Sequence, residues 1–303
     1  MSYKYIFGPV LSRRFGSSLG IDLSPDSKSC NFDCIYCELK AVKPQSFITS
    51  PPKIQNIIEE LERALKEFES VDVITITSNG EPTLYEELDR LVDEINRIKG
   101  DKKLLILSNA STVNQPKIRD ILKKIDIVKL SLDCADEKCF KKIDRPLKGV
   151  KIEEIIKGIK SFREVYDKEL VIEILVVEGI NDKTEQMQKL NEILNDIKPN
   201  RVDLGTIDRP PAYKVNPVKT KKLQELSKNF CNIPLSISYK KDYEVKKIDF
   251  SEDEILALLK RRPQSEDDIK RQFSQKSKNI LDKLIKEKRV YRENVAGVLF
   301  YRG

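Results

Sequence analysis

Three cysteines near the N-terminus have the spacing of a metal site. Cys30, Cys34 and Cys37 form a Cys-x3-Cys-x2-Cys pattern. Thiolates this close in sequence can converge on one metal centre. Three thiolates on a four-iron cluster leave one iron without a protein ligand, so an external group can bind and react there. Structural zinc normally closes with four protein ligands, so a zinc knuckle or an incidental group of thiols is the less favoured alternative.

Composition limits the other chemistry that is open to the chain. It contains no histidine among its 303 residues, which excludes histidine-based triads, histidine general bases and mixed Cys/His zinc sites. Any metal must therefore be held by thiolate, carboxylate or exogenous ligands.

The overall composition is that of a globular protein, with 39% hydrophobic and 35% charged residues. The length suits one large α/β domain and a small one. The N-terminus lacks the apolar stretch of a signal peptide, and no segment approaches ~18 consecutive apolar residues, so we expect no membrane partner. A cytoplasmic location follows, where cysteines are reduced and available to metal.

Short β-rich runs alternate with longer amphipathic runs. The predicted strands are Ser17–Leu23, Val71–Thr77, Leu104–Ser108, Ile127–Leu132, Leu170–Val177 and Arg201–Thr206. The predicted helices are Pro52–Glu67, Tyr85–Lys99, Gln115–Lys123, Ile152–Tyr166 and Lys183–Asp196. Alternating strands and helices imply right-handed crossovers and a parallel sheet. Six units are too few for a closed eight-stranded barrel, so we predict an α/β fold with a partial (βα)6 TIM-like barrel, whose ligands gather at the C-terminal strand ends.

The pattern changes after Asn216. A helix over Val218–Lys228 and a strand over Leu235–Tyr239 precede a charged segment, residues 240–247, which is typical of a linker. Capping-box patterns then open two helices, at Ser251 and at Ser265, before a third helix and a β-hairpin. We predict a barrel domain over residues 1–240, a linker over 241–250 and a winged-helix-like domain over 251–303.

The predicted small domain is basic. From Arg271 to Gly303 there are nine Lys or Arg and three Asp or Glu, within a chain of net charge +7. This excess is compatible with an anionic partner such as RNA or another nucleic acid. A solvated lysine-rich surface is an equal alternative.

The cysteine motif, with Tyr36 just before its last cysteine, resembles the signature of the radical S-adenosylmethionine (SAM) superfamily. The resemblance implies that Cys30, Cys34 and Cys37 ligate a [4Fe–4S] cluster. It also implies that SAM chelates the fourth iron and that Tyr36 packs near its adenine. Reductive cleavage of SAM would then yield a 5′-deoxyadenosyl radical that abstracts hydrogen, with the electron supplied by a flavodoxin or ferredoxin type of donor.

A second motif supports the resemblance. The strand Val71–Thr77 runs into Ser-Asn-Gly-Glu-Pro-Thr, which resembles the Gly-Gly-Glu element of the superfamily. We expect Gly80, Glu81 and Pro82 to bind the cofactor, with the Gly80 backbone approaching it closely and the backbone or Glu81 holding the ammonium group. Taken alone, the same residues would be a turn before a helix.

Polar residues end the next predicted strands. Asn109, Ser131 and Asp133 are candidates to bind the ribose or the methionyl carboxylate of SAM. Helix capping is an equal alternative for each of them. Asn181 and Asp182 are weaker candidates.

A closer resemblance, over roughly residues 5–240, is to the branch of tRNA wybutosine synthases and their bacterial relatives. The matching residues are residues 8–22, Glu38, Ser131 to Asp133, Phe140, Ile143, Arg145-Pro146 and Asp208 to Pro211. The archaeal enzymes of that branch carry further N-terminal cysteines, and none precedes Cys30. This departure argues against the same base-forming reaction.

The remaining cysteines are Cys134, Cys139 and Cys231. We predict that they are ordinary thiols, the alternative being a second cluster or zinc site. Four arginines lie in the segments that match this branch. They are predicted either to line the mouth of the barrel or to form ion pairs within the fold: Arg13, Arg14, Arg145 and Arg209.

The sequence therefore predicts a radical SAM enzyme, with RNA, in particular tRNA, as the first candidate substrate. A peptide or small-molecule substrate is the alternative within that class. An iron–sulfur-sensing winged-helix DNA-binding regulator is the alternative from another class.

Overall fold

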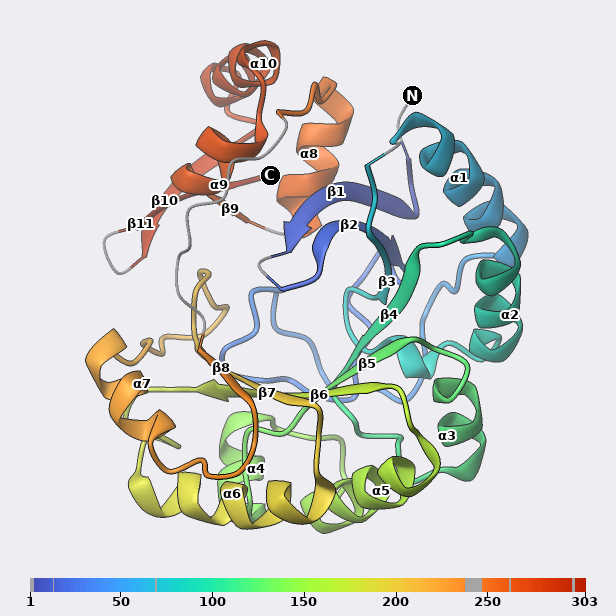
Figure 1. Cartoon of the computed structure of the whole chain (residues 1–303). Coiled ribbons are helices and arrows are strands. Elements are labelled where there is room, and N and C mark those ends of the chain that lie inside the picture. The colour runs from blue at the N-terminus through green and yellow to red at the C-terminus, as the bar shows by residue number, and fades with distance from the viewer. Residues whose placement is uncertain (1–2, 13, 69, 238–246, 262, 296–297) are drawn as a thin grey trace.

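The structure is a computed structural model of the 303-residue chain. It describes residues 3–12, 14–68, 70–237, 247–261, 263–295 and 298–303 (Figure 1). Within these ranges the chain forms an eight-stranded sheet curved into a partial barrel, and a smaller three-stranded sheet with three helices.

The large sheet has its strands in chain order. They are β1 (Ile6–Ser12), β2 (Gly16–Asp22), β3 (Val73–Thr77), β4 (Lys103–Ser108), β5 (Ile127–Ser131), β6 (Glu169–Val176), β7 (Arg201–Thr206) and β8 (Leu235–Ile237). Strand β1 pairs antiparallel with β2, and all the other pairs are parallel. Parallel pairing in sequential order brings the C-terminal ends of β2 to β8 to one rim of the barrel.

Helices cover the outer face of this sheet (Figure 1). They are α1 (Ile54–Glu67), α2 (Leu88–Ile98), α3 (Pro116–Leu122), α4 (Glu137–Ile143), α5 (Ile152–Val165), α6 (Thr184–Ile197) and α7 (Thr220–Ser227), with a 3-10 turn at Pro82–Leu84. In α1 the buried residues Ile54, Ile57, Leu61 and Ala64 recur at helical spacing, so one stripe of the helix faces the strands.

The inside of the barrel is closed at the end opposite the rim. Val73, Leu105, Ile127 and Val171 form a separate apolar cluster there, against which Phe15 packs. Thr77 and Thr206, at the C-terminal ends of β3 and β7, line a cavity in the interior.

The C-terminal segment consists of α8 (Glu252–Arg261), β9 (Gln264–Ser265), α9 (Glu266–Gln272), α10 (Gln275–Lys286), β10 (Tyr291–Val295) and β11 (Val298–Arg302). Its small sheet has the order β10-β11-β9 and is antiparallel. The Ser265–Asp268 capping box begins α9.

This segment packs against the edge of the barrel. Val10 of β1 belongs to the same apolar cluster as Phe250, Ile255 and Phe273. The Gln272 side chain also donates a hydrogen bond to the Pro9 carbonyl.

The predicted α/β partial barrel is confirmed, and all six predicted barrel strands are present. The elements that were missed are the edge strand β1, the 3-10 turn, the two-residue strand β9, and α4, a helix of seven residues. Residues 238–239 of the last predicted strand and residues 240–246 of the predicted linker lie outside the described ranges. The division into two domains and the winged-helix resemblance stay predictions. No helix in the part of the chain that the structure describes is long and apolar enough to cross a membrane.

Candidate active site

The three cysteines of the motif lie in the long loop between β2 and α1, at the rim of the barrel. Backbone hydrogen bonds hold this loop on two sides. On one side, Ser29 N donates a hydrogen bond to Asn79 O at 2.8 Å, and Ser29 O accepts one from Glu81 N at 3.0 Å. On the other side Ile35 N donates to Ile143 O, at the end of α4, at 2.9 Å. The cysteine loop is therefore fixed by β3 and α4 together.

All three cysteines line one cavity of about 190 Å³. Five of the seven residues predicted to bind the cofactor also line it: Tyr36, Gly80, Glu81, Asn109 and Ser131. Asp133 instead lines a much smaller neighbouring cavity together with Tyr36. Pro82 is buried at the start of the 3-10 turn.

The backbone of Gly80, which was expected to approach the cofactor closely, approaches the cysteine loop closely. A Cβ at this position would lie 1.8 Å from the Ser29 carbonyl oxygen, and the backbone has a φ of +147°. Such a distance leaves no room for any side chain, and the φ value is rarely adopted by other residues. The glycine thus sets the position of the residue that precedes Cys30.

Glu81 is a buried carboxylate that already has protein partners. It accepts hydrogen bonds from Thr83 N at 3.0 Å, Thr83 Oγ1 at 2.7 Å, Ser108 Oγ at 2.8 Å and Asn109 N at 2.6 Å. Burial raises the pKa of Glu81, and these donors oppose that rise. Glu81 consequently ties the ends of β3 and β4 together.

Asn109 reaches from the end of β4 to the cysteine loop. Its side-chain amide donates to Asn31 Oδ1 at 2.9 Å and lies 3.6 Å from Cys30 Sγ. A donor at this position can stabilise negative charge on the sulfur.

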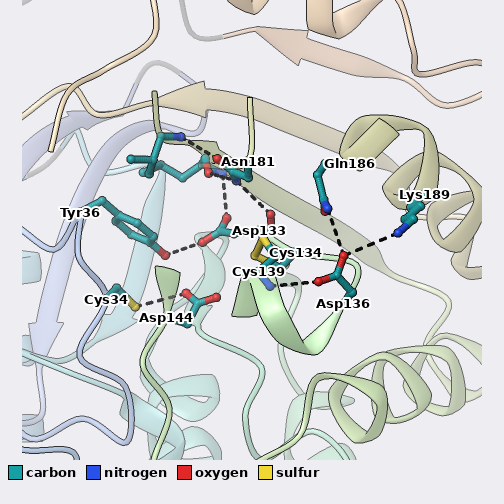
Figure 2. Close-up of a disulfide and its surroundings, with 12 residues drawn as sticks. Cys34, Tyr36, Asp133, Cys134, Asp136, Cys139, Asp144, Asn181, Gln186 and Lys189 are labelled. Carbon is teal, nitrogen blue, oxygen red and sulfur yellow. Dashed lines mark hydrogen bonds and ion pairs between the residues drawn. A yellow bond between two sulfur atoms is a disulfide. The ribbon is translucent and has the colours of Figure 1, made fainter. Parts of the chain in front are cut away.

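The partly buried Tyr36 and the buried Asp133 form a hydrogen-bonded pair (Figure 2). The Tyr36 hydroxyl donates to Asp133 Oδ2 at 2.6 Å, and Leu175 N donates to Asp133 Oδ1 at 2.7 Å. Asn181 Nδ2 donates to the Asp133 carbonyl at 3.0 Å. Burial raises the pKa of Asp133 to about 7, although the bonds from Tyr36 and Leu175 oppose the rise. Asp133 therefore orients Tyr36.

The Cys30 thiol is buried, and the Cys34 and Cys37 thiols are partly buried. Burial raises the pKa of Cys30 to about 12, with Glu81 adding to the rise. Burial likewise raises the pKa values of Cys34 and Cys37. Since a coordinating metal deprotonates a thiol outright, a bound metal supplies the positive charge that thiolates need here.

Lys28 was missed by the sequence analysis and lies in the same cavity. Its side chain is only 6% exposed, and its Nζ atom has no hydrogen-bond partner among the described residues. Burial lowers the pKa of Lys28, but the Cys37 and Cys30 sulfurs outweigh burial and the pKa is raised. The position of the lysine two residues before Cys30 was the available signal, but burial of a loop lysine is not visible in a sequence.

A second cavity, of about 420 Å³, occupies the barrel interior next to the first. Thr77, Leu107, Lys129 and Glu173 line both cavities. At this junction Lys129 Nζ lies 2.5 Å from Glu173 Oε1 and 3.3 Å from the buried Asp203. The volume falls in the range of small-molecule sites.

Two of the four highlighted arginines contribute to the barrel rim. Arg209 is paired with Glu38 at 3.2 Å and donates to the Pro263 carbonyl. Arg145 stacks on the Tyr213 ring, 4.4 Å from its centroid.

The third arginine, Arg14, lines the larger cavity, where its Nε lies 3.1 Å from Asp203. Arg13 lies outside the described residues. The three arginines that the structure describes therefore form ion pairs or ring contacts within the fold.

The prediction of ordinary thiols was wrong for two cysteines. Cys134 and Cys139 form a disulfide between the end of β5 and α4 (Figure 2). Asp136 accepts a hydrogen bond from Cys139 N at 3.0 Å and so folds the chain back, which brings the two Cα atoms to 5.6 Å. Cys231 is exposed and free. The disulfide leaves these two sulfurs unable to serve as thiolate ligands.

The donor set fits an iron–sulfur cluster. In the described ranges no three His, Cys, Asp or Glu side chains are grouped to hold a single metal ion. A four-iron cluster binds each thiolate through a different iron, so its ligands line a common cavity without converging on one point, and these three cysteines line such a cavity. The buried ammonium of Lys28 suits a negatively charged occupant.

The comparisons with known proteins agree with this geometry. A model described as the radical SAM superfamily matches residues 25–190. A "UPF0026 protein" of Helicobacter pylori strain J99 is 39% identical over 298 residues, which cover 98% of this chain and 96% of that protein. The chain therefore belongs to the radical SAM superfamily and, within it, to the UPF0026 proteins.

Solved structures show the same fold. TYW1 with a lysine-pyruvate adduct bound has a TM-score of 0.52 and 18% identity, with 70% of this chain and 72% of that chain covered. Streptococcus suis SuiB bound to its precursor peptide SuiA has a TM-score of 0.57 and 21% identity, with 73% and 48% covered. Enzymes of this superfamily use a [4Fe–4S] cluster and SAM, and this chain is an enzyme of that class.

Proposed function

We propose that Cys30, Cys34 and Cys37 ligate the [4Fe–4S] cluster and that SAM binds between the cluster and the barrel interior. The convergence of the three thiols on one cavity carries this proposal. When bound, the cluster and SAM supply a one-electron reductive cleavage that yields a 5′-deoxyadenosyl radical. A flavodoxin or ferredoxin type of protein in the cytoplasm would supply the electron.

The surrounding residues bind and orient. Ser131 and Asn109 offer hydroxyl and amide groups to the polar parts of SAM, because both line the cavity beside the thiols. Glu81 and Asp133 act mainly by holding Asn109 and Tyr36 in place, since their carboxylates are engaged by the protein. The substrate would enter the larger cavity and meet the radical near Thr77 and Lys129, which line both cavities.

We propose RNA, in particular tRNA, as the substrate. Lys276 and Lys286 are exposed on α10, and the exposed Lys288 lies three residues before Tyr291, whose side chain is also exposed. Basic residues combined with an exposed aromatic ring suit a nucleic acid, because they bind phosphates and a base can stack on the ring.

The C-terminal segment is attached at the rim. Arg302 donates to the Glu38 carbonyl at 2.7 Å, and Glu38 lines the larger cavity. An RNA held by this segment would thus lie beside the cavity mouth.

The enzyme activity is tested by anaerobic reconstitution, reduction and chromatography for 5′-deoxyadenosine, with and without cellular RNA. We expect C34A to lose the visible absorbance of the cluster. Normal four-iron content in C34A would show that the ligand set is wrong. If the reconstituted protein contains the cluster but never cleaves SAM, the proposed reaction is wrong.

The substrate is tested by crosslinking the chain to RNA in cells. Charge reversal in K286E/K288E should strongly reduce the captured RNA, whereas K117E/K157E changes two exposed lysines on α3 and α5 and should not. Equal capture by both double variants would argue against this surface. Without any captured RNA, a small molecule or a peptide side chain becomes the better candidate, because either fits a cavity of about 420 Å³.

A further inference from the structure

Lys28 presents an unusual problem of charge. Its ammonium group is buried and has no hydrogen-bond partner in the described part of the chain. Burying an ammonium group without compensation costs several kcal/mol, so a native fold retains one only where something negative balances it.

The protein balances this charge incompletely. The nearest carboxylate oxygen, Asp33 Oδ1, lies 3.8 Å from Lys28 Nζ, beyond hydrogen-bonding distance. The other oxygen of Asp33 accepts a hydrogen bond from the Tyr213 hydroxyl and lies 3.7 Å from Arg145. One carboxylate thus faces two cations, which leaves an excess of positive charge beside the thiols.

The other charges on the cavity wall are engaged elsewhere. Glu173 is paired with Lys129 at 2.5 Å, and Glu81 accepts its four hydrogen bonds from Thr83, Ser108 and Asn109. The remaining groups beside Lys28 that can carry negative charge are the Cys37 and Cys30 sulfurs, which are the proposed ligands of what occupies the shared cavity.

We propose that the Lys28 ammonium is the counter-ion of the iron–sulfur cluster and sets its reduction potential. One-electron reduction, by dithionite in vitro or by a flavodoxin-type donor, makes the cluster and its thiolates more negative by one charge. A fixed cation at short range in a buried site stabilises the reduced form more than the oxidised form. The inference rests on the proposed cysteine ligands.

The test is a redox titration of the reconstituted, SAM-free protein, followed by the electron paramagnetic resonance signal of the reduced cluster. We expect the ratio of reduced to oxidised cluster at a given potential to be about tenfold lower in K28M, which is a shift of about 59 mV to more negative values for a one-electron couple. K28R keeps the charge and should stay close to the wild type. K40M removes an exposed lysine three residues after Cys37 and should leave the potential unchanged.

The outcomes separate cleanly. If K28M has full iron content and the wild-type reduction potential, the inference about Lys28 is wrong, but the proposed cysteine ligands still stand. If C34A retains four irons, the proposed cysteine ligands are wrong. If K28M and K28Q both lose iron, circular dichroism of the iron-free variants decides. A wild-type spectrum together with full iron content in K28R means that the cluster needs the charge, which supports the inference. Loss of the fold means that Lys28 serves folding, which overturns it.

Discussion

At the scale of single residues, the contact between Gly80 and Ser29 makes a sharp prediction. G80A places a methyl group where the Ser29 carbonyl lies, 1.8 Å away, so the loop that carries Cys30 must move. We expect the reconstituted variant to lose most of its iron while circular dichroism shows a folded chain. G149A is the matched control, because its φ is also positive, at +98°, and a Cβ there meets nothing within 4 Å. Full iron content in G80A would contradict this role.

Because the pKa of Asp133 is raised, we expect the stability of the fold to depend on pH. Burial raises its pKa from 3.8 to about 7, so between these values the folded protein binds more protons than the unfolded chain. The free energy of unfolding should therefore fall as pH rises through this window. D133N removes this contribution, and urea denaturation of the iron-free protein should show a smaller slope against pH. D120N, at an exposed position, should keep the wild-type slope.

At the scale of elements, the disulfide joins the end of β5 to α4. Both elements support the site. Asp133, just after β5, accepts a hydrogen bond from Tyr36, and Asp144, just after α4, accepts one from Cys34 Sγ at 3.4 Å. Closing so short a loop stabilises the fold by about 2 kcal/mol. We expect a reductant to lower the melting temperature of the iron-free wild type and to have no effect on C134A/C139A. An equal response of both proteins would show that the disulfide does not stabilise the fold.

The elements also show where sequence patterns fail. Strand β1 contains Pro9, which lacks an N–H donor, and its pairing with β2 shifts register between Phe7 and Val10. Proline is tolerated there because β1 is an edge strand, a property that depends on the assembled sheet. Helix α4 has the same length as α3, but no proline marks its start as Pro116 does in α3, and only Cys139, Phe140 and Ile143 are buried in it.

At the scale of the whole molecule, the C-terminal segment and the barrel share an apolar contact at Val10. This side chain is 7% exposed and packs with residues of α8 and α9. We expect V10S to reduce the free energy of unfolding of the whole chain by about 2 kcal/mol, because it buries a hydroxyl group in an apolar cluster. V165S alters a valine that is 54% exposed and should have little effect. Calorimetry can measure both, and equal melting temperatures for V10S and the wild type would refute the contact.

The sequence by itself determined the class of chemistry and the partial barrel. Cysteine spacing and the alternation of strands and helices are local patterns, so both can be read along the chain. The site needed more, because its side chains come from loops that meet only when β2 to β6 assemble. Tertiary structure therefore decided that Gly80 supports Ser29, that Glu81 and Asp133 hold neighbouring side chains, and that Cys134 pairs with Cys139. It alone placed Lys28 beside the thiols, since burial is a property of the packed chain.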